Sequence, residues 1–473
     1  MKPQWWTNLA DEALISRWKE EARRSFTSGG VTNKHFVNQA VESLLRELCY
    51  IAYHELIRLK TGGVIAPTSI HGVFISDCIS ESVTRLATYT ESLETESLKK
   101  KKWREGSDGK VLDLIHPSEY CLVYGRSLRR DNVTQPVGSK PIVFTGRSRN
   151  YQQTRERSPR FQWLPSEFDI GYDGRVKLRS YINNLNVREY PELQDSIRSV
   201  FESMVPMFEA TLGSLQSEPS YRISELSYNG NIYERFEVHQ FFQQIDERLQ
   251  KTQNQRRVIP GLPKSYNTPL GSRKYILAGR NVQVIVKMAN IQLTPENPVF
   301  HGGNWHMEGM EYEAIVAVGL VYYSVENITQ STLAFYKGEI ETLQGRCVVF
   351  PNHLPHRVKP FALQDKTRPG YRKILAFFFV DPDTRILSTS DVGIQQADWL
   401  AEELFDTCGI GAKLPYEVVR QIALFAGAMT EIDALIFAHE IMEERKNGKE
   451  EAEAMRIRRN ELDTMTKNLD LID

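Results

Sequence analysis

The chain has 473 residues, with 59 basic and 60 acidic side chains and a formal net charge of −1 at pH 7. This balance argues against a general electrostatic attraction to nucleic acid or to a membrane surface. Its five cysteines are odd in number and scattered, which argues against a disulfide framework or a cysteine-based zinc cluster and favours a reducing, cytoplasmic compartment.

Apolar residues at helical spacing mark the N-terminal region, residues 1–125. They recur over residues 14–22, over 41–52 and around 83–93, and predict helices packed on the core. The third pattern ends in a run of lysines at 99–102, which is either a solvated helix C-terminus or a nuclear signal. The first residues lack the apolar core of a signal peptide and no apolar run approaches membrane-spanning length, so we expect no membrane partner.

Residues 126–160 are the most basic stretch of the chain, with nine basic side chains against Asp131 and Glu156. Such a stretch is an exposed loop paired with acids elsewhere, an approach for an anionic substrate, or a contact to a phosphate backbone. Its two aromatic residues, Phe144 and Tyr151, are too few for the base stacking that single-strand binders use. We therefore interpret it as an exposed loop and do not expect a nucleic-acid partner.

From residue 161 the pattern is mainly β, interrupted by a helix over about 192–215. This pattern predicts an α+β fold with a β core over residues 161–390 and a helical region over 391–473. The charged last segment of the helical region is either a solvated helix or a subunit contact. In a helix-backed jelly roll, both faces of the strands are buried. Near-continuous apolar runs that predict such strands span residues 282–293, 313–325, 346–350 and 373–380.

Three residues of the β region have the side chains needed for a metal site. His306 and Glu308 point to the same face of an extended strand, because alternate side chains of a strand share a face. His356 follows 50 residues later, next to a predicted strand. Two imidazoles and one carboxylate form the facial triad that holds non-haem Fe(II) and leaves coordination positions open.

Nearby residues offer alternatives to this triad. His353 lies in the same loop as His356 and is the alternative third ligand. We interpret His301, Glu311 and Glu313 as surface side chains.

Arg372 opens the last predicted strand, 16 residues after His356. Taken alone, it reads as a strand-edge charge. A guanidinium can also hold a carboxylate through two parallel hydrogen bonds. Its place after the triad makes Arg372 a candidate clamp for the far carboxylate of 2-oxoglutarate.

The order His-x-acid, about fifty residues, His and then Arg resembles the 2-oxoglutarate/Fe(II)-dependent oxygenase superfamily, whose fold is a cupin-like double-stranded β-helix. Glu308 stands where many of its members have Asp, and Asn186 follows Leu185 where the closer relatives usually have His-Pro. The chain is more closely similar to a mostly fungal family of uncharacterised proteins near that superfamily. The segments that carry this resemblance are residues 161–168, 180–185, 284–291, 305–310 and 370–375.

The resemblance implies an enzyme, a 2-oxoglutarate-dependent Fe(II) dioxygenase that oxidises a C–H bond of a small molecule such as an amino acid or secondary metabolite. Hydroxylation, desaturation and ring closure are all open outcomes, and Fe(II), 2-oxoglutarate and O₂ are the implied cofactors. The alternatives are a cupin-like metalloenzyme without 2-oxoglutarate and a non-catalytic jelly-roll interaction module. The residues proposed to face the substrate are Tyr181, Asn183, Asn290 and Tyr322, each of which is otherwise a buried residue with a satisfied hydrogen bond.

Overall fold

The computed structural model describes residues 5–28, 34–52, 56–58, 63–77, 80–130, 160–216, 275–336, 338–407 and 413–446. Most of the predicted basic loop and of the charged C-terminal segment lies outside these residues. None of the helices in the described part of the chain combines the length and hydropathy needed to cross a bilayer.

The N-terminal region contains the predicted helices and also strands that were not predicted. After a 3-10 helix at Trp5–Ala10, the helices are α1 (Glu12–Ser28), α2 (Lys34–Tyr50) and α3 (Ser80–Lys99). Between α2 and α3 the chain forms β1 (Ile57–Arg58), β2 (Val64–Pro67) and β3 (Phe74–Ser76), and β3 extends the main sheet by pairing with a later strand. These strands have at most four residues, which is too short for an alternating pattern to stand out.

The remaining elements confirm the mainly β pattern and the helix predicted over 192–215. The two later helices are α6 and α7, and a last helical segment spans residues 431–446. In chain order the elements are β4 (Val111–Ile115), β5 (Leu122–Val123), β6 (Phe161–Gln162), β7 (Ser166–Ile170), β8 (Val176–Leu178), α4 (Pro191–Leu215), β9 (Asn281–Leu293), β10 (Val299–Phe300), the 3-10 helix η4 (Glu311–Glu313), β11 (Ile315–Glu326), β12 (Thr332–Phe335), β13 (Gly338–Glu341), β14 (Cys347–Pro351), β15 (His356–Val358), β16 (Phe361–Ala362), β17 (Gly370–Val380), α6 (Ala397–Thr407) and α7 (Tyr416–Phe425).

Two antiparallel sheets matter for the site. The main sheet has the strand order β1-β2-β3-β14-β11-β17-β9-β7-β8, with β4 also paired to β9. The smaller sheet has the order β13-β12-β15, and the start of β15 forms a further antiparallel bridge between His356 and His306. The fold is therefore a mixture of helices and antiparallel sheets, as the α+β prediction required.

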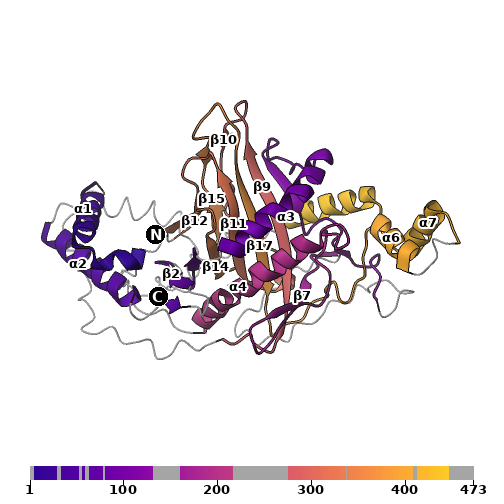
Figure 1. Ribbon diagram of the computed structural model, residues 1–473, viewed down its shortest axis with the longest axis horizontal. Coiled ribbons are helices and arrows are strands. Elements are labelled where there is room, and N and C mark those ends of the chain that lie inside the picture. Colours follow the sequence, from indigo (N-terminus) through magenta and orange to yellow (C-terminus); the bar gives the residue numbers. More distant parts are fainter. Residues whose placement is uncertain are drawn as a thin grey trace, which may run out of the picture.

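Both faces of the main sheet are covered, which explains the near-continuous apolar strands. Helices α3 and α4 lie across one face (Figure 1), where Phe208 of α4 stacks on Phe379 of β17 with ring centroids 4.9 Å apart. On the other face, Phe350 and Phe378 share a core with Leu333 and Phe335 of the smaller sheet. The space between the two sheets is thus an apolar interior into which alternate residues of β9, β11 and β17 point.

Candidate metal centre

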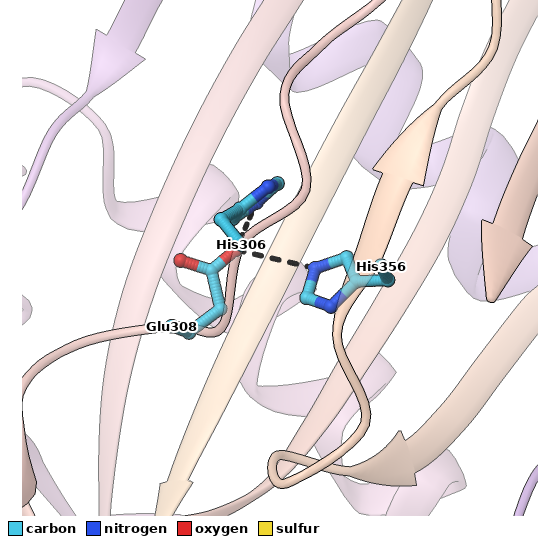
Figure 2. A group of neighbouring side chains, drawn as sticks. All are labelled: His306, Glu308 and His356. Carbon is cyan, nitrogen blue, oxygen red and sulfur yellow. Dashed lines mark ion pairs between the residues drawn. The ribbon is translucent and has the colours of Figure 1, made fainter. Parts of the chain in front are cut away.

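His306, Glu308 and His356 come together as predicted (Figure 2). Their ligand atoms all lie within 4.8 Å of one another, a spacing at which one ion can be held. Oxygen Oε1 of Glu308 lies 3.4 Å from Nε2 of His306 and 3.7 Å from Nε2 of His356. His356 lies at the start of β15, whereas His306 forms only an isolated β-bridge and Glu308 lies in a bend, not on the strand that the sequence predicted. Two segments 50 residues apart in sequence therefore present a single donor set of two imidazoles and one carboxylate.

Backbone hydrogen bonds hold these two segments in register. The amide of His306 donates to the carbonyl of His356 at 3.1 Å, and the amide of His356 donates back at 3.0 Å. Asn352 adds a side-chain clamp, since it accepts from the amide of Glu308 and donates to its carbonyl, both at 2.9 Å. The turn after Glu308 requires a glycine: Gly309 has φ +66°, and a Cβ there would lie 2.5 Å from Cδ1 of Ile315.

The two imidazole rings are oriented for metal binding. Nδ1 of His306 donates to the carbonyl of Asn304 at 2.8 Å, and Nδ1 of His356 donates to the carbonyl of Leu354 at 3.3 Å. A proton on Nδ1 leaves the lone pair on Nε2, the atom that faces Glu308 in both residues. Backbone carbonyls thus select the tautomer that a metal ligand needs.

The carboxyl group of Glu308 is held in its ionised form. Burial by itself raises its pKa, but the adjacent imidazoles of His306 and His356, together with the nearby charge of Lys287, bring the pKa well below its ordinary value. The side chain of His306 is 37% exposed, whereas those of Glu308 and His356 are 14% and 4% exposed. The centre is therefore anionic and opens toward solvent on the side of His306.

Arg372 is a buried cation on the interior face of β17. Only 1% of the residue is exposed, and its Nη1 donates to Oγ of Ser331 at 2.8 Å. Its guanidinium lies 5.4 Å from the ring centroid of Tyr322 and 5.5 Å from that of Phe361, and its Nε has no hydrogen-bond partner. No acidic side chain in the described part of the chain pairs with it. A buried guanidinium with an unused donor has the chemistry to bind an anion.

Two of the four residues proposed to face the substrate lie on opposite faces of the main sheet. Tyr322 is buried in the interior beside Arg372. Asn290, in contrast, accepts a hydrogen bond at 2.9 Å from the hydroxyl of Tyr323, which packs in the core beneath α3 and α4. The structure therefore does not bring Asn290 to the interior, because its position on β9 gives it the helix-covered face.

Tyr181 and Asn183 bond to loop backbones rather than to the triad. The hydroxyl of Tyr181 donates to the carbonyl of Gly393 at 2.7 Å. The amide of Asn183 donates to the carbonyls of Glu119 and Tyr120 at 3.3 and 3.1 Å. These contacts fit the alternative interpretation, in which each is a buried residue that holds the fold.

One surface prediction is wrong, and its cause is a distant partner. Glu313 is fully buried; it pairs with Arg445 of the C-terminal helical segment and accepts from the backbone amides of Trp163 at 2.7 Å and Met310 at 2.8 Å. The pair anchors the loop that carries Glu308. His301 and Glu311 are exposed as predicted, and His353 is exposed and lies outside the cluster.

Sequence reasoning also missed Lys287, Arg104 and Asp113, which lie around the centre. Arg104 forms a bidentate ion pair with Asp113 of β4, with Nε at 3.0 Å from Oδ2. The charge of Lys287 on β9 is close enough to lower the pKa of Glu308. The available signal was that Lys287 is the only charged residue in the predicted strand 282–293.

Comparison with known proteins places the chain in a family. Residues 39–337 and 336–403 match the model of a family described as "Protein of unknown function (DUF4246)". The match covers most of the chain, which therefore belongs to this family, in agreement with the expected resemblance to a family of uncharacterised proteins. A search of curated proteins finds no match.

Solved structures give only slight likenesses. IDO from Bacillus thuringiensis is 12% identical over 46% of this chain and 75% of its own, with a TM-score of 0.22. The Fe(II)/(alpha)ketoglutarate-dependent dioxygenase TqaL is 11% identical over 46% of this chain and 65% of its own, with a TM-score of 0.22. A Pseudomonas putida prolyl-4-hydroxylase is 14% identical over 20% of this chain and 51% of its own, with a TM-score of 0.16.

Proposed function

We propose that this protein is a 2-oxoglutarate-dependent Fe(II) oxygenase that oxidises a C–H bond of a small molecule. The observation that carries the proposal is the cluster of His306, Glu308 and His356, in which both Nε2 atoms face one ionised carboxylate. This donor set suits Fe(II) and leaves coordination positions open for a cosubstrate and O₂. Both imidazoles are held by backbone carbonyls in the orientation that metal ligands adopt.

We further propose that the two sheets form a double-stranded β-helix. Along the chain, strands alternate between the sheets: β9 and β11 lie in the main sheet, with the bridge-forming His306 between them. Strands β12 and β13 then lie in the smaller sheet, β14 in the main, β15 in the smaller and β17 in the main. Such alternation around one shared core supports this assignment.

In the proposed enzyme, His306, Glu308 and His356 hold the iron, and Arg372 binds the far carboxylate of 2-oxoglutarate. Iron, with 2-oxoglutarate and O₂, supplies the oxidation of the C–H bond. Ser331 keeps Nη1 of Arg372 in place, so the remaining guanidinium donors stay directed at one anion.

Two further features of the chain serve this binding. Burial raises the pKa of Tyr322 to about 12, so its hydroxyl stays protonated next to Arg372 and can donate to the same carboxylate. The rings of Phe350 and Phe335 lie with their centroids 4.7 and 6.2 Å from that of His356, and they keep water from its inner side.

The substitution Arg372→Met tests the cosubstrate assignment. We expect it to weaken 2-oxoglutarate binding by about 10- to 100-fold, because hydrogen bonds to a charged group are lost from a buried site. Calorimetric titration of 2-oxoglutarate into zinc-loaded protein measures this directly. Arg368→Met, which changes an exposed arginine close to the start of β17, is the matched control and should bind as the unchanged protein does.

Two other results would favour the alternatives. If neither protein binds 2-oxoglutarate, the centre belongs to a cupin-like metalloenzyme that uses no oxo-acid. If Arg372→Met binds 2-oxoglutarate as tightly as the unchanged protein, Arg372 is not the residue that holds the far carboxylate. If the unchanged protein takes up no metal, an interaction module becomes the better account.

A further inference from the structure

Lys287 is a cation on the inner face of β9. Its neighbours in alternation, Ile285 and Ala289, both belong to cores on the side of the sheet away from α4, whereas Val286 and Met288 belong to the helix-covered core. On the adjacent strand β17 its register partner is Ala376, whose small side chain leaves the lysine stem unobstructed. The ammonium group therefore projects into the interior between the two sheets, the region of the metal centre.

The neighbouring arginines are paired with acids, whereas Lys287 has no partner among the residues that the structure describes. Arg104 is paired with Asp113 and Arg445 with Glu313. Within the described residues, Lys287 has no hydrogen bond and no ion pair. It is partly buried, and burial together with the charge of Arg104 lowers its pKa to about 8, against the opposing effects of Glu308 and Asp113. At neutral pH it is thus still mainly a cation.

The charges of the proposed enzyme leave Lys287 without a balancing negative charge. In the proposed enzyme the two charges of Fe(II) are offset by Glu308 and by one carboxylate of 2-oxoglutarate, and the other carboxylate is offset by Arg372. The pairs of Arg104 and Arg445 are internally neutral. One positive charge, that of Lys287, remains in a largely desolvated interior, where an unpaired charge is costly. A group with a single negative charge would balance it, whereas a doubly charged phosphate would leave an excess.

We propose that Lys287 is a substrate-binding residue and that the substrate oxidised at this centre carries a carboxylate, held by its ammonium group. The inference rests on the proposed function and names the substrate class for the same site. The carboxylate lies against β9 beside the ion pair of Arg104 and Asp113, and the carbon chain extends toward Glu308. Lys287 and Arg372 lie on neighbouring strands and bind different organic acids. Lys287 binds the carboxylate of the substrate, and Arg372 binds the far carboxylate of 2-oxoglutarate.

The test uses trifluoroacetate as the probe and the full chain loaded with zinc and 2-oxoglutarate. Zinc does not react with O₂, so binding is separated from turnover, and trifluoroacetate is a small monocarboxylate visible by ¹⁹F NMR. We expect saturable broadening of its signal, no broadening of the neutral trifluoroacetamide, and binding weakened about tenfold or more in Lys287→Met. Lys287→Arg keeps the charge and should retain most of the binding, which separates the loss of charge from a folding defect.

Lys177→Met is the matched control, because Lys177 is an exposed lysine on β8 of the same sheet. The inference is overturned if Lys287→Met binds trifluoroacetate as well as the unchanged protein does. It is also overturned if Lys287→Met, like Arg372→Met, loses 2-oxoglutarate, because Lys287 would then serve the cosubstrate. Calorimetry of zinc and 2-oxoglutarate in the unchanged protein tests the proposed function separately, and a failure there removes the charge argument as well.

Discussion

Replacing His356 by alanine is expected to lower the affinity for Fe(II) by about 100-fold or more, since losing even a group that only supports a metal ligand costs up to that much. Three protein ligands leave no spare donor, so no other described side chain takes the place of the imidazole. The effect should appear in anaerobic metal titrations as well as in any turnover assay.

His353→Ala is the matched control for this change. It removes an imidazole three residues away in the same loop, and His353 lies outside the cluster. Iron affinity should therefore be retained. Loss of iron binding in His353→Ala, with retention in His356→Ala, would mean that the third ligand has been assigned to the wrong histidine.

The substitution Arg445→Met is expected to lower the free energy of unfolding by about 3–5 kcal/mol, because it leaves the carboxylate of Glu313 buried without its partner. Glu313 has a fully buried side chain and that of Arg445 is 9% exposed. The guanidinium also lies 3.7 Å from the ring centroid of Trp163, a contact that the variant loses. Urea unfolding of the metal-free protein measures the change.

A pair on the surface provides the comparison. Arg188 and Asp406 lie 2.9 Å apart with side chains 41% and 60% exposed, so Arg188→Met should cost no more than about 1 kcal/mol. Adding Glu313→Gln to Arg445→Met removes the stranded charge and should restore part of the lost stability. Equal effects of Arg188→Met and Arg445→Met would contradict the structural importance given to the buried pair.

The pair of His306 and Glu308 and the long strands were predictable from local patterns. The i, i+2 spacing of these two residues needs no distant information, although the structure has an isolated bridge and a bend there and no strand, and long apolar runs identify β9, β11 and β17 directly. The third ligand required a partner 50 residues away, and the order of motifs supplied it. The short strands β1 to β3 carry too few residues for any periodicity, so their addition to the main sheet was not visible.

The face of the sheet on which a side chain lies, and pairs between residues far apart in sequence, were much harder to predict. Strand β9 is apolar on both faces, so its sequence does not say which face is interior, and it did not reveal that Asn290 lies on the helix-covered face, away from the triad. Once the interior face of β9 is known, the alternation of side chains along the strand puts Lys287 on that face and Asn290 on the opposite one. Glu313 looked like a surface acid because its partner, Arg445, lies 132 residues away in a helix that no local pattern connects to it.

The most direct test of the proposed function is to add 2-oxoglutarate to the anaerobic, Fe(II)-loaded protein and record the visible spectrum. We predict a charge-transfer band of the chelated cosubstrate in the unchanged protein and in His353→Ala, no band in His356→Ala, and a need for much more 2-oxoglutarate in Arg372→Met. Iron that binds without producing any band at saturating 2-oxoglutarate would contradict the assignment and leave a metal centre that does not use this cosubstrate.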